Sequence, residues 1–357
     1  MSAIRTINVS LGDRSYPIVI GNGLLNGGFD LTDFVPGSDC LIVSNDVVAP
    51  LYRDRLLPNL SGKAISTLDL PDGESHKSMA TMRTVLDQLV SKGANRDTTV
   101  IALGGGVVGD IAGFAAACYM RGVAFIQVPT TLLAQVDASV GGKTGVNHPH
   151  GKNLIGAFHQ PRVVMIDIDT LSTLPDRELR AGLAEIIKYG AICDIDFFAW
   201  LEENMAALLE RDTEALVYAI GRSCELKARI VADDERELGR RAILNFGHTF
   251  AHAIENCQGY GEWLHGEAVA AGMVLAASLS DIAEAENERL QALVAAAGLP
   301  VKAPAIAVDE WLRAMGLDKK VQNKQLRFVL LGALGESMLT SSYDAGKLRR
   351  ILGGSAV

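Results

Sequence analysis

Short apolar runs alternate with helical patterns over the first half of the chain. Consecutive apolar residues in runs of this length are typical of strands buried on both faces. We predict strands at Thr6–Val9, Tyr16–Ile20, Asp39–Ser44, Lys63–Asp69, Thr98–Leu103, Ala124–Pro129 and Val163–Asp167. Between them, Met79–Lys92 and Asp110–Tyr119 show the periodicity of helices. Strands that alternate with helices indicate a largely parallel sheet with helices on both faces.

Helical periodicity replaces the strand pattern after Pro175. The predicted helices are Asp176–Tyr189, Ile195–Glu210, Asp212–Asp234, Thr249–Cys257, His265–Ala285 and Glu286–Ala297. A late apolar run, Leu326–Leu331, predicts a strand or hairpin. A chain of 357 residues usually folds as two domains. We therefore predict an α/β domain over 1–175, followed by a mainly α-helical domain over 176–357.

Composition and charge exclude some classes of partner. Hydrophobic residues make up 48% of the chain but aromatic residues only 6%, so we expect a core of Ala, Val, Leu and Ile. The net charge of −9 argues against nucleic acid or an anionic membrane as a partner. Five cysteines lie far apart, and no signal peptide or membrane span is apparent in the sequence. We expect free thiols and a cytoplasmic protein.

A histidine cluster indicates metal chemistry. Three of the seven histidines, His248, His252 and His265, fall within 18 positions. His248 and His252 are four apart and share one face of a predicted helix. An upstream helix could offer the carboxylate of Glu185, and two imidazoles with one carboxylate suit a divalent cation, most readily zinc. The alternative is a packed or solvated histidine pair, and nothing local tells which histidine binds a metal.

A glycine-rich turn indicates a nucleotide site. Gly104-Gly-Gly-Val-Val-Gly-Asp110 follows a predicted strand, precedes a helix and satisfies the spacing G-x-G-x-x-G. In that context, backbone N–H groups at the start of a helix can bind a pyrophosphate. The turn follows the fifth strand instead of the first, and no acidic residue ends the next strand. Asp46 and Glu74 could bind the riboses instead. The alternative is a glycine turn that serves packing alone.

Several basic residues accompany these motifs. Lys143 and Lys152 lie in predicted Gly/Asn-rich loops, where a cation suits a phosphate or carboxylate ligand. For the other basic residues the alternative is an ordinary solvated surface charge. These others are Arg121, Lys188, Lys227 and Arg241.

Taken together, the motifs resemble the 3-dehydroquinate synthase family, in order from about Asp46 to Lys320. They are Asp72-Gly-Glu-x-x-Lys77, Gly104-Gly-Gly-Val-Val-Gly-Asp110, Tyr119-Met-Arg-Gly122, Gln127-Val-Pro-Thr-Thr-Leu-Leu-Ala-Gln-Val-Asp-Ala-Ser-Val-Gly-Gly-Lys143 and Arg241-x-x-Leu-Asn-Phe-Gly-His-Thr249. The resemblance implies a lyase of the shikimate pathway, which leads to chorismate and the aromatic amino acids. It also implies NAD and a zinc or cobalt ion as cofactors. The fold that it implies is an α/β dinucleotide domain and an α-helical domain with the active site between them.

The resemblance also implies roles for individual residues. The metal ligands would be Glu185, His248 and His265. The catalytic residues would be Lys143, Lys188, Glu237, Arg241 and His252. The substrate would be bound by Arg121, Asp137, Lys143, Asn153, Lys188, Lys227, Arg241, Asn245 and Lys320. NAD would contact Asp46, Asp72, Gly73, Glu74, Lys77, Gly105, Gly106, Val107, Val108, Gly109, Asp110, Thr130, Thr131, Lys143, Lys152, Thr170, Leu171, Ser172 and Thr173. Arg121 would reach a neighbouring subunit, which implies a homodimer, and Lys319 remains an alternative to Lys320.

The implied reaction converts 3-deoxy-D-arabino-heptulosonate 7-phosphate to 3-dehydroquinate and phosphate. The steps are transient oxidation by NAD, phosphate elimination, reduction, ring opening and an intramolecular aldol closure. The reduction regenerates NAD, so NAD is not consumed. One alternative is a sugar phosphate cyclase that uses sedoheptulose 7-phosphate or glucose 6-phosphate. Another is a glycerol or iron-dependent alcohol dehydrogenase, which releases NADH. A third is a non-catalytic metal or nucleotide sensor.

Overall fold

The computed structural model describes residues 4–259, 261–316 and 326–354. The chain divides into two compact units. We call Met1–Pro175 with Leu216–Arg236 the α/β unit, and Asp176–Ala215 with Glu237–Val357 the helical unit. Each unit is described by itself.

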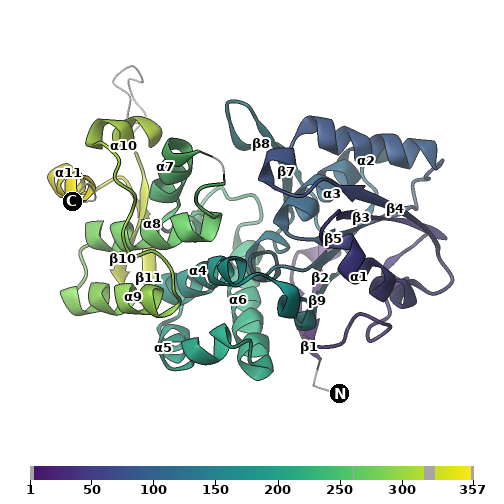
Figure 1. Ribbon diagram of the computed structural model, residues 1–357, viewed down its shortest axis with the longest axis horizontal. Helices are drawn as coiled ribbons and strands as arrows, with labels where there is room; N and C mark the ends of the chain where they lie inside the picture. Colours follow the sequence, from purple (N-terminus) through teal and green to yellow (C-terminus); the bar gives the residue numbers. More distant parts are fainter. Residues whose placement is uncertain (1–3, 260, 317–325, 355–357) are drawn as a thin grey trace. The chain divides into compact units, whose positions relative to one another are not determined.

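A seven-stranded sheet forms the centre of the α/β unit (Figure 1). Its strand order is β1-β2-β9-β6-β5-β3-β4, and only β1 and β2 pair antiparallel. All seven predicted strands are confirmed, with ends that move by one residue at most, because buried parallel strands leave continuous apolar runs in the sequence. Their bounds are β1 Arg5–Val9, β2 Tyr16–Gly21, β3 Asp39–Asn45, β4 Ala64–Leu70, β5 Thr99–Gly104, β6 Ala124–Pro129 and β9 Val164–Asp167.

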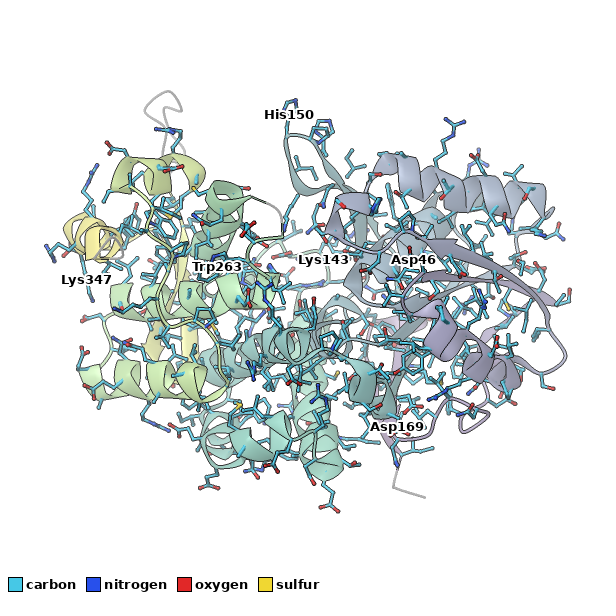
Figure 2. The ribbon with its side chains drawn as sticks, viewed as in Figure 1. Asp46, Lys143, His150, Asp169, Trp263 and Lys347 are labelled. Atoms are coloured by element: carbon cyan, nitrogen blue, oxygen red, sulfur yellow. The ribbon has the colours of Figure 1, made fainter. Side chains whose placement is uncertain are left out.

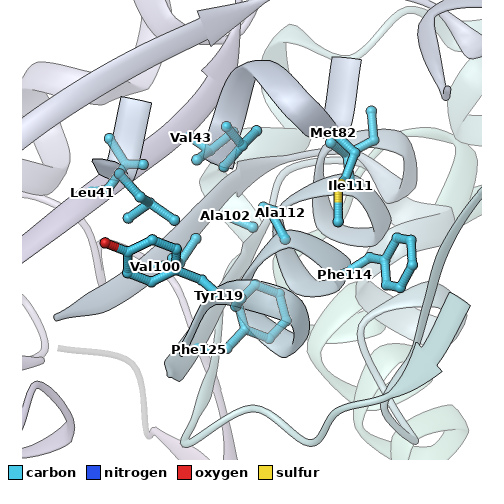
Figure 3. Packing of buried hydrophobic residues seen from close by; sticks show 14 of the residues in the cluster. Leu41, Val43, Met82, Val100, Ala102, Ile111, Ala112, Phe114, Tyr119 and Phe125 are labelled. Atoms are coloured by element: carbon cyan, nitrogen blue, oxygen red, sulfur yellow. The ribbon is translucent and has the colours of Figure 1, made fainter. Parts of the chain in front are cut away.

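Helices cover both faces of this sheet, as predicted. Leu41 and Val43 of β3 point to the face that packs against α2 (Met79–Ser91) and α3 (Gly106–Cys118), as Figure 3 shows. The alternate residue Ile42 points to the other face, which packs against α1 (Ala49–Leu56). The predicted start of α3 at Asp110 was late by four residues, because the helix already begins inside the glycine turn.

A two-stranded hairpin, β7 (Lys143–His148) and β8 (Gly151–Phe158), also belongs to the α/β unit. Figure 2 shows Lys143 at its base and His150 at its tip. The predicted loops for Lys143 and Lys152 were wrong, since both residues lie on its strands. The strands approach so closely that a Cβ on Gly156 would lie 2.1 Å from the Thr144 carbonyl oxygen. Glycines therefore serve strand pairing here.

The helical unit confirms the second half of the prediction. It comprises α4 Asp176–Cys193, α5 Ile195–Leu209, α7 His248–Gln258, α8 His265–Leu279, α9 Glu284–Ala296, α10 Val308–Ala314 and α11 Ala345–Gly354, with the hairpin β10 Phe328–Ala333 and β11 Glu336–Thr340. The helix predicted to run to Ala285 ends at Leu279 instead. The Ser280 hydroxyl donates to the Ala276 carbonyl and accepts the N–H of Leu331, and so it ends the helix.

Helix α6 (Thr213–Asp233) corrects the predicted domain boundaries. Its residues from Leu216 onward belong to the α/β unit, although they were predicted within the domain 176–357. The reason is their packing: the Cys224 thiol donates to the Gln135 carbonyl, and Glu225 accepts from Arg5 at 2.6 Å. A helical pattern reveals that a face is buried but does not reveal against which partner.

The predicted fold class, an α/β domain followed by a mainly α-helical one, is confirmed. Among the described residues, none of the helices combines the length and the apolar character needed to cross a bilayer.

Candidate metal centre and nucleotide site

Three helices of the helical unit bring one carboxylate and two imidazoles together. Glu185 lies in the middle of α4, whereas His248 and His265 are the first residues of α7 and α8. The Glu185 Oε1 atom lies 3.7 Å from His248 Nε2 and 3.8 Å from His265 Nε2. One ligand atom from each residue lies within 4.8 Å of the others. Among the described residues, this is the set of acidic, histidine and cysteine side chains that could hold a metal.

Glycines allow these helices to approach one another. A Cβ on Gly266 of α8 would lie 2.0 Å from the Ala181 carbonyl oxygen of α4. A Cβ on Gly272 of α8 would lie 2.3 Å from the carbonyl oxygen of Gly247, which precedes α7 with a φ of 79°. Only glycine fits these positions without displacing backbone. The close contacts hold the starts of α7 and α8 beside α4, where their histidines meet Glu185.

The carboxylate at this centre is prepared for a cation. Glu185 is fully buried, and its Oε1 atom accepts no hydrogen bond among the described residues. The Lys188 ammonium, 1% exposed, lies against Oε2 as an ion pair. Oε1 therefore faces the two imidazoles alone. Tetrahedral zinc with bonds of about 2.0–2.1 Å needs ligand atoms roughly 3.3 Å apart, so small side-chain shifts suffice to coordinate the ion.

Each imidazole has an acceptor for its other ring nitrogen. His248 Nδ1 lies 3.1 Å from the Phe246 carbonyl oxygen, and His265 Nδ1 lies 3.3 Å from Glu255 Oε1. These contacts favour an Nδ1–H and leave both Nε2 lone pairs towards Glu185. Burial, together with the Lys188 charge and the imidazoles of His265 and His252, holds the pKa of His248 well below its usual value. His248 is thus in the neutral form that binds metals.

Other predicted residues of the helical unit lie in two settings. Arg241 and Lys188 are buried, each 1% exposed. Asn245 donates to Glu237 Oε1 at 2.7 Å, and both residues line a pocket of about 720 Å³. Arg327, which the sequence did not suggest, lines the same pocket.

The exposed His252 lies near the triad, with its ring centroid 5.7 Å from that of His248. Lys319 and Lys320 lie outside the described residues, so the predicted phosphate contact there stays a prediction.

Most predicted NAD residues follow the carboxyl ends of parallel strands. Asp46 follows β3, residues 72–77 follow β4, residues 105–110 follow β5, Thr130 and Thr131 follow β6, and residues 170–173 follow β9. These ends meet at one edge of the sheet, where open α/β sheets bind their ligands. The N–H groups that begin α3 are available there for an anion.

Polar side chains at this edge are already paired with one another. The Lys77 ammonium donates to Asp110, with which it forms an ion pair, and to Asn153 Oδ1 at 2.6 Å. Glu74 Oε1 accepts from Asn147 of β7 at 2.7 Å. Desolvation raises the pKa of the Asp110 carboxyl, and the Lys77 charge opposes this effect. Lys77, Asp110 and Asn153, three of the predicted residues, are thus brought together.

A second pair lies nearby in the same unit. The Lys227 ammonium of α6 donates to the Asp137 carbonyl and to its Oδ1, each at 2.6 Å. Thr170 and Thr173 instead contact the Tyr52 hydroxyl, at 3.1 Å through the Thr170 carbonyl oxygen and at 2.5 Å through Thr173 Oγ1. These two threonines therefore stabilise the local fold, in addition to any contact that they make with NAD.

Glu255 is the residue that the sequence interpretation missed at the metal centre. On α7 it follows His248 by seven residues and His252 by three. This spacing places all three on one helix face and could have revealed it. Phe246 contributes a main-chain carbonyl, for which no side-chain signal exists.

Comparisons with known proteins agree with this geometry. A family model described as the N-terminal part of 3-dehydroquinate synthase matches residues 67–181, and its C-terminal counterpart matches residues 182–321. A 3-dehydroquinate synthase from Teredinibacter turnerae is 57% identical over 355 residues, which is 98% of each chain. The chain belongs to the 3-dehydroquinate synthase family. The predicted family is therefore confirmed.

Solved structures of sugar phosphate cyclases share the fold. A 2-deoxy-scyllo-inosose synthase complexed with carbaglucose-6-phosphate, NAD⁺ and Co²⁺ matches with a TM-score of 0.88 and 26% identity, over 98% of this chain and 99% of that one. A 2-epi-5-epi-valiolone synthase from Streptomyces hygroscopicus subsp. jinggangensis, with NAD⁺ and Zn²⁺ bound, matches with a TM-score of 0.87 and 30% identity, over 100% and 99%. Glycerol dehydrogenase from Schizosaccharomyces pombe, at 16% identity and a TM-score of 0.62, over 95% of this chain and 88% of that one, shares the fold alone.

Proposed function

We propose that the chain converts 3-deoxy-D-arabino-heptulosonate 7-phosphate to 3-dehydroquinate and phosphate, with NAD and a divalent metal as cofactors. The observation that carries the proposal is the meeting of Glu185, His248 and His265 in a member of this family. The motifs over residues 67–321 support it, since both family models match there without a gap between them.

Glu185, His248 and His265 would hold the metal. The fit rests on the buried Glu185 Oε1 atom, which accepts no hydrogen bond among the described residues, and on two imidazoles whose Nε2 atoms face it. A bound divalent ion supplies a Lewis acid that lowers the pKa of coordinated hydroxyl groups. Two nitrogen ligands and one oxygen ligand accept zinc or cobalt. The metal-bound relatives hold Co²⁺ in one case and Zn²⁺ in the other, which is compatible with either ion here.

The residues at the carboxyl edge of the sheet would bind NAD. The start of α3 would receive the pyrophosphate, and Asp46 and Glu74 would bind riboses. NAD supplies a hydride acceptor that is regenerated within each turnover. Lys77 and Asp110 are paired before any ligand arrives, and this pair would fix the start of α3 and the segment after β4 relative to each other.

Cationic side chains would bind the anionic groups of the substrate. Lys188 and Arg241 are buried cations of the helical unit, and burial strengthens their attraction for a phosphate or carboxylate. Lys143 and Lys227 would add charge from the α/β unit. The exposed imidazole of His252, beside the triad, would transfer a proton or contact the phosphate.

We further propose a homodimer. Arg121 is exposed and has a φ of 68°, with Met120 before it at 47°, so this short segment presents the arginine from a left-handed turn. The resemblance assigns that arginine to a neighbouring subunit. Light scattering should give twice the mass of one chain, and a monomer at micromolar concentration would exclude this part of the proposal.

The five cysteines support a reducing compartment, because none forms a disulfide among the described residues. We propose the cytoplasm. Alkylation of all five thiols in freshly lysed native cells, without added reductant, would agree with this placement.

A discontinuous assay tests the function. Purified protein, zinc and NAD are incubated with the heptulosonate phosphate, and phosphate and dehydroquinate are both measured. The expected result is one phosphate per dehydroquinate, without net absorbance near 340 nm. Stoichiometric NADH would instead indicate a dehydrogenase. Phosphate released from sedoheptulose 7-phosphate or glucose 6-phosphate, but not from the heptulosonate, would indicate another cyclase. No product from any of them would leave a non-catalytic sensor.

A further inference from the structure

The Glu255 side chain lies beside the candidate metal centre but is not one of its three proposed ligands. It lies one helical turn beyond His252 on α7 and is almost completely buried, with 6% of its side chain exposed. An ionised carboxylate in such a place costs free energy unless a cation or hydrogen-bond donors surround it. Its Oε1 atom lies 3.3 Å from His265 Nδ1. The acidic group is thus aimed at the ring that opens α8.

The two histidines of the triad are held in parallel ways. Each ring turns Nε2 towards Glu185 Oε1, at 3.7 and 3.8 Å, and Nδ1 towards an oxygen. For His248 that oxygen is the main-chain carbonyl of Phe246, at 3.1 Å, which belongs to the turn before α7. For His265 that oxygen is Oε1 of the Glu255 carboxylate, at 3.3 Å.

We propose that Glu255 is a positioning residue for His265, and this inference rests on the proposed metal-binding function. Its carboxylate accepts the Nδ1–H of His265, which fixes the tautomer and the orientation of the ring. Nε2 then keeps its lone pair for a divalent cation shared with Glu185 and His248. The negative charge also makes the imidazole a stronger donor to a cation.

The main chain around His265 is held separately from its ring. Glu267 Oε2 accepts the Leu264 N–H at 2.8 Å, and Arg177 of α4 forms an ion pair with Glu267 at 2.6 Å. These contacts position the start of α8 but do not touch the imidazole. Substitution of Glu255 should therefore change the ring orientation and leave the backbone of the site in place.

The test measures zinc affinity in the full-length chain. Metal is first removed and then titrated back against a chromophoric chelator of known affinity. Changes to an acceptor of a ligating histidine weaken metal binding by about tenfold to a hundredfold. Glu255→Gln keeps the side-chain volume and an oxygen acceptor, so its loss of zinc affinity should be about tenfold. Glu255→Ala removes the acceptor, so its loss should be about a hundredfold. Glu262→Gln is the control, because it removes a charge from the exposed turn before His265 without contacting its ring.

A second measurement separates positioning from general stability. In the metal-free protein, ¹⁵N NMR should show His265 with its proton on Nδ1. In Glu255→Ala the proton should move to a mixture of Nδ1 and Nε2. Thermal unfolding of the metal-free variants reports folding, and if Glu255→Ala does not fold, Glu255→Gln carries the test.

Zinc affinity within twofold of the parent in a folded Glu255 variant, with an unchanged tautomer, would overturn the positioning role. A lower melting temperature alone would do the same, because it would show a structural residue. Failure of the metal site itself is distinguishable: the parent would then not bind zinc, or His265→Ala would bind it equally well. That result would remove this inference together with the ligand assignment.

Discussion

In each unit a buried lysine pairs with a carboxylate: Lys188 with Glu185 in the helical unit, and Lys77 with Asp110 in the α/β unit. Both carboxylates belong to predicted cofactor sites. The difference lies in what surrounds each pair: Glu185 Oε1 faces two imidazoles, whereas Lys77 also donates to Asn153 Oδ1. The first arrangement suits a shared cation. The second fixes the polar side chains around which a nucleotide would bind.

The largest expected effect comes from the metal centre. Glu185→Gln should weaken zinc binding by more than about a hundredfold, because it changes a proposed direct ligand. Substitution of a residue that only contacts a ligand already lowers metal affinity by about tenfold to a hundredfold. In the parent, zinc at a thousand times its dissociation constant should stabilise the fold by about 4 kcal/mol. Calorimetric unfolding with and without zinc measures both effects. The exposed Glu203→Gln of α5 is the control, and retention of the full zinc shift in Glu185→Gln would disprove the ligand assignment.

A substitution at the candidate NAD site, at the carboxyl edge of the sheet, should have a smaller effect. Asp110→Asn should weaken NAD binding roughly tenfold, or about 1.4 kcal/mol, because the Lys77 ammonium loses its charged partner and the start of α3 is held less firmly. Zinc affinity should not change. Titration calorimetry with each ligand checks both halves, with the exposed Asp87→Asn of α2 as control. Equal losses of NAD and zinc affinity would contradict this expectation, because they would show that binding at the two sites is energetically coupled.

A backbone test probes the glycine turn. Gly109→Ala would place a Cβ 2.7 Å from Gln127 Oε1, so the buried Gln127 side chain must shift, and the variant should gain less than the roughly 0.5–1 kcal/mol that alanine normally adds over glycine in a helix. Urea unfolding gives this value. Gly353→Ala on α11 meets only the Val308 side chain at 3.9 Å and serves as the matched variant. If both variants are equally stable, the packing role assigned to Gly109 is incorrect.

The comparison between the two candidate sites also shows what the sequence could predict. The strands of the sheet were predictable because strands such as β5 are buried along their whole length and leave unbroken apolar runs. The hairpin β7–β8 was not, since Gly145, Gly151 and Gly156 interrupt its alternation and resemble a loop. The close strand pairing that Gly145 and Gly156 allow is apparent only in three dimensions.

The candidate site was predictable to the extent that family motifs span it. Helix periodicity alone placed His248 and His252 on one face but left the choice of ligand open. The third proposed ligand, His265, comes from another helix, and its approach depends on Gly266 and Gly272. Glu255 shares a helix face with His248 and His252, and that spacing could have revealed it, but its contact with His265 of α8 is apparent only in the structure.

The smallest expected effect concerns pH and an ion pair whose residues were not predicted to bind a ligand. Burial alone raises the pKa of the Glu225 carboxyl, but hydrogen bonds and charges from Arg5 and Arg222 outweigh it and lower that pKa below its usual value. The pair's stabilisation should therefore be complete above the unfolded pKa and be lost as pH falls through the folded pKa. Glu225→Gln should cost about 1 kcal/mol or less at pH 7, and less at pH 4 than at pH 7. Urea unfolding at both values checks this, and a larger cost at the lower pH would contradict it.

X-ray absorption at the zinc edge tests the central claim most directly. The purified, zinc-loaded chain should show two imidazole rings with nitrogen at about 2.0–2.1 Å, together with an oxygen ligand at a similar distance. This is the signature of His248, His265 and Glu185 around one ion. Sulfur at about 2.3 Å, or a shell without two imidazoles, would contradict the assignment.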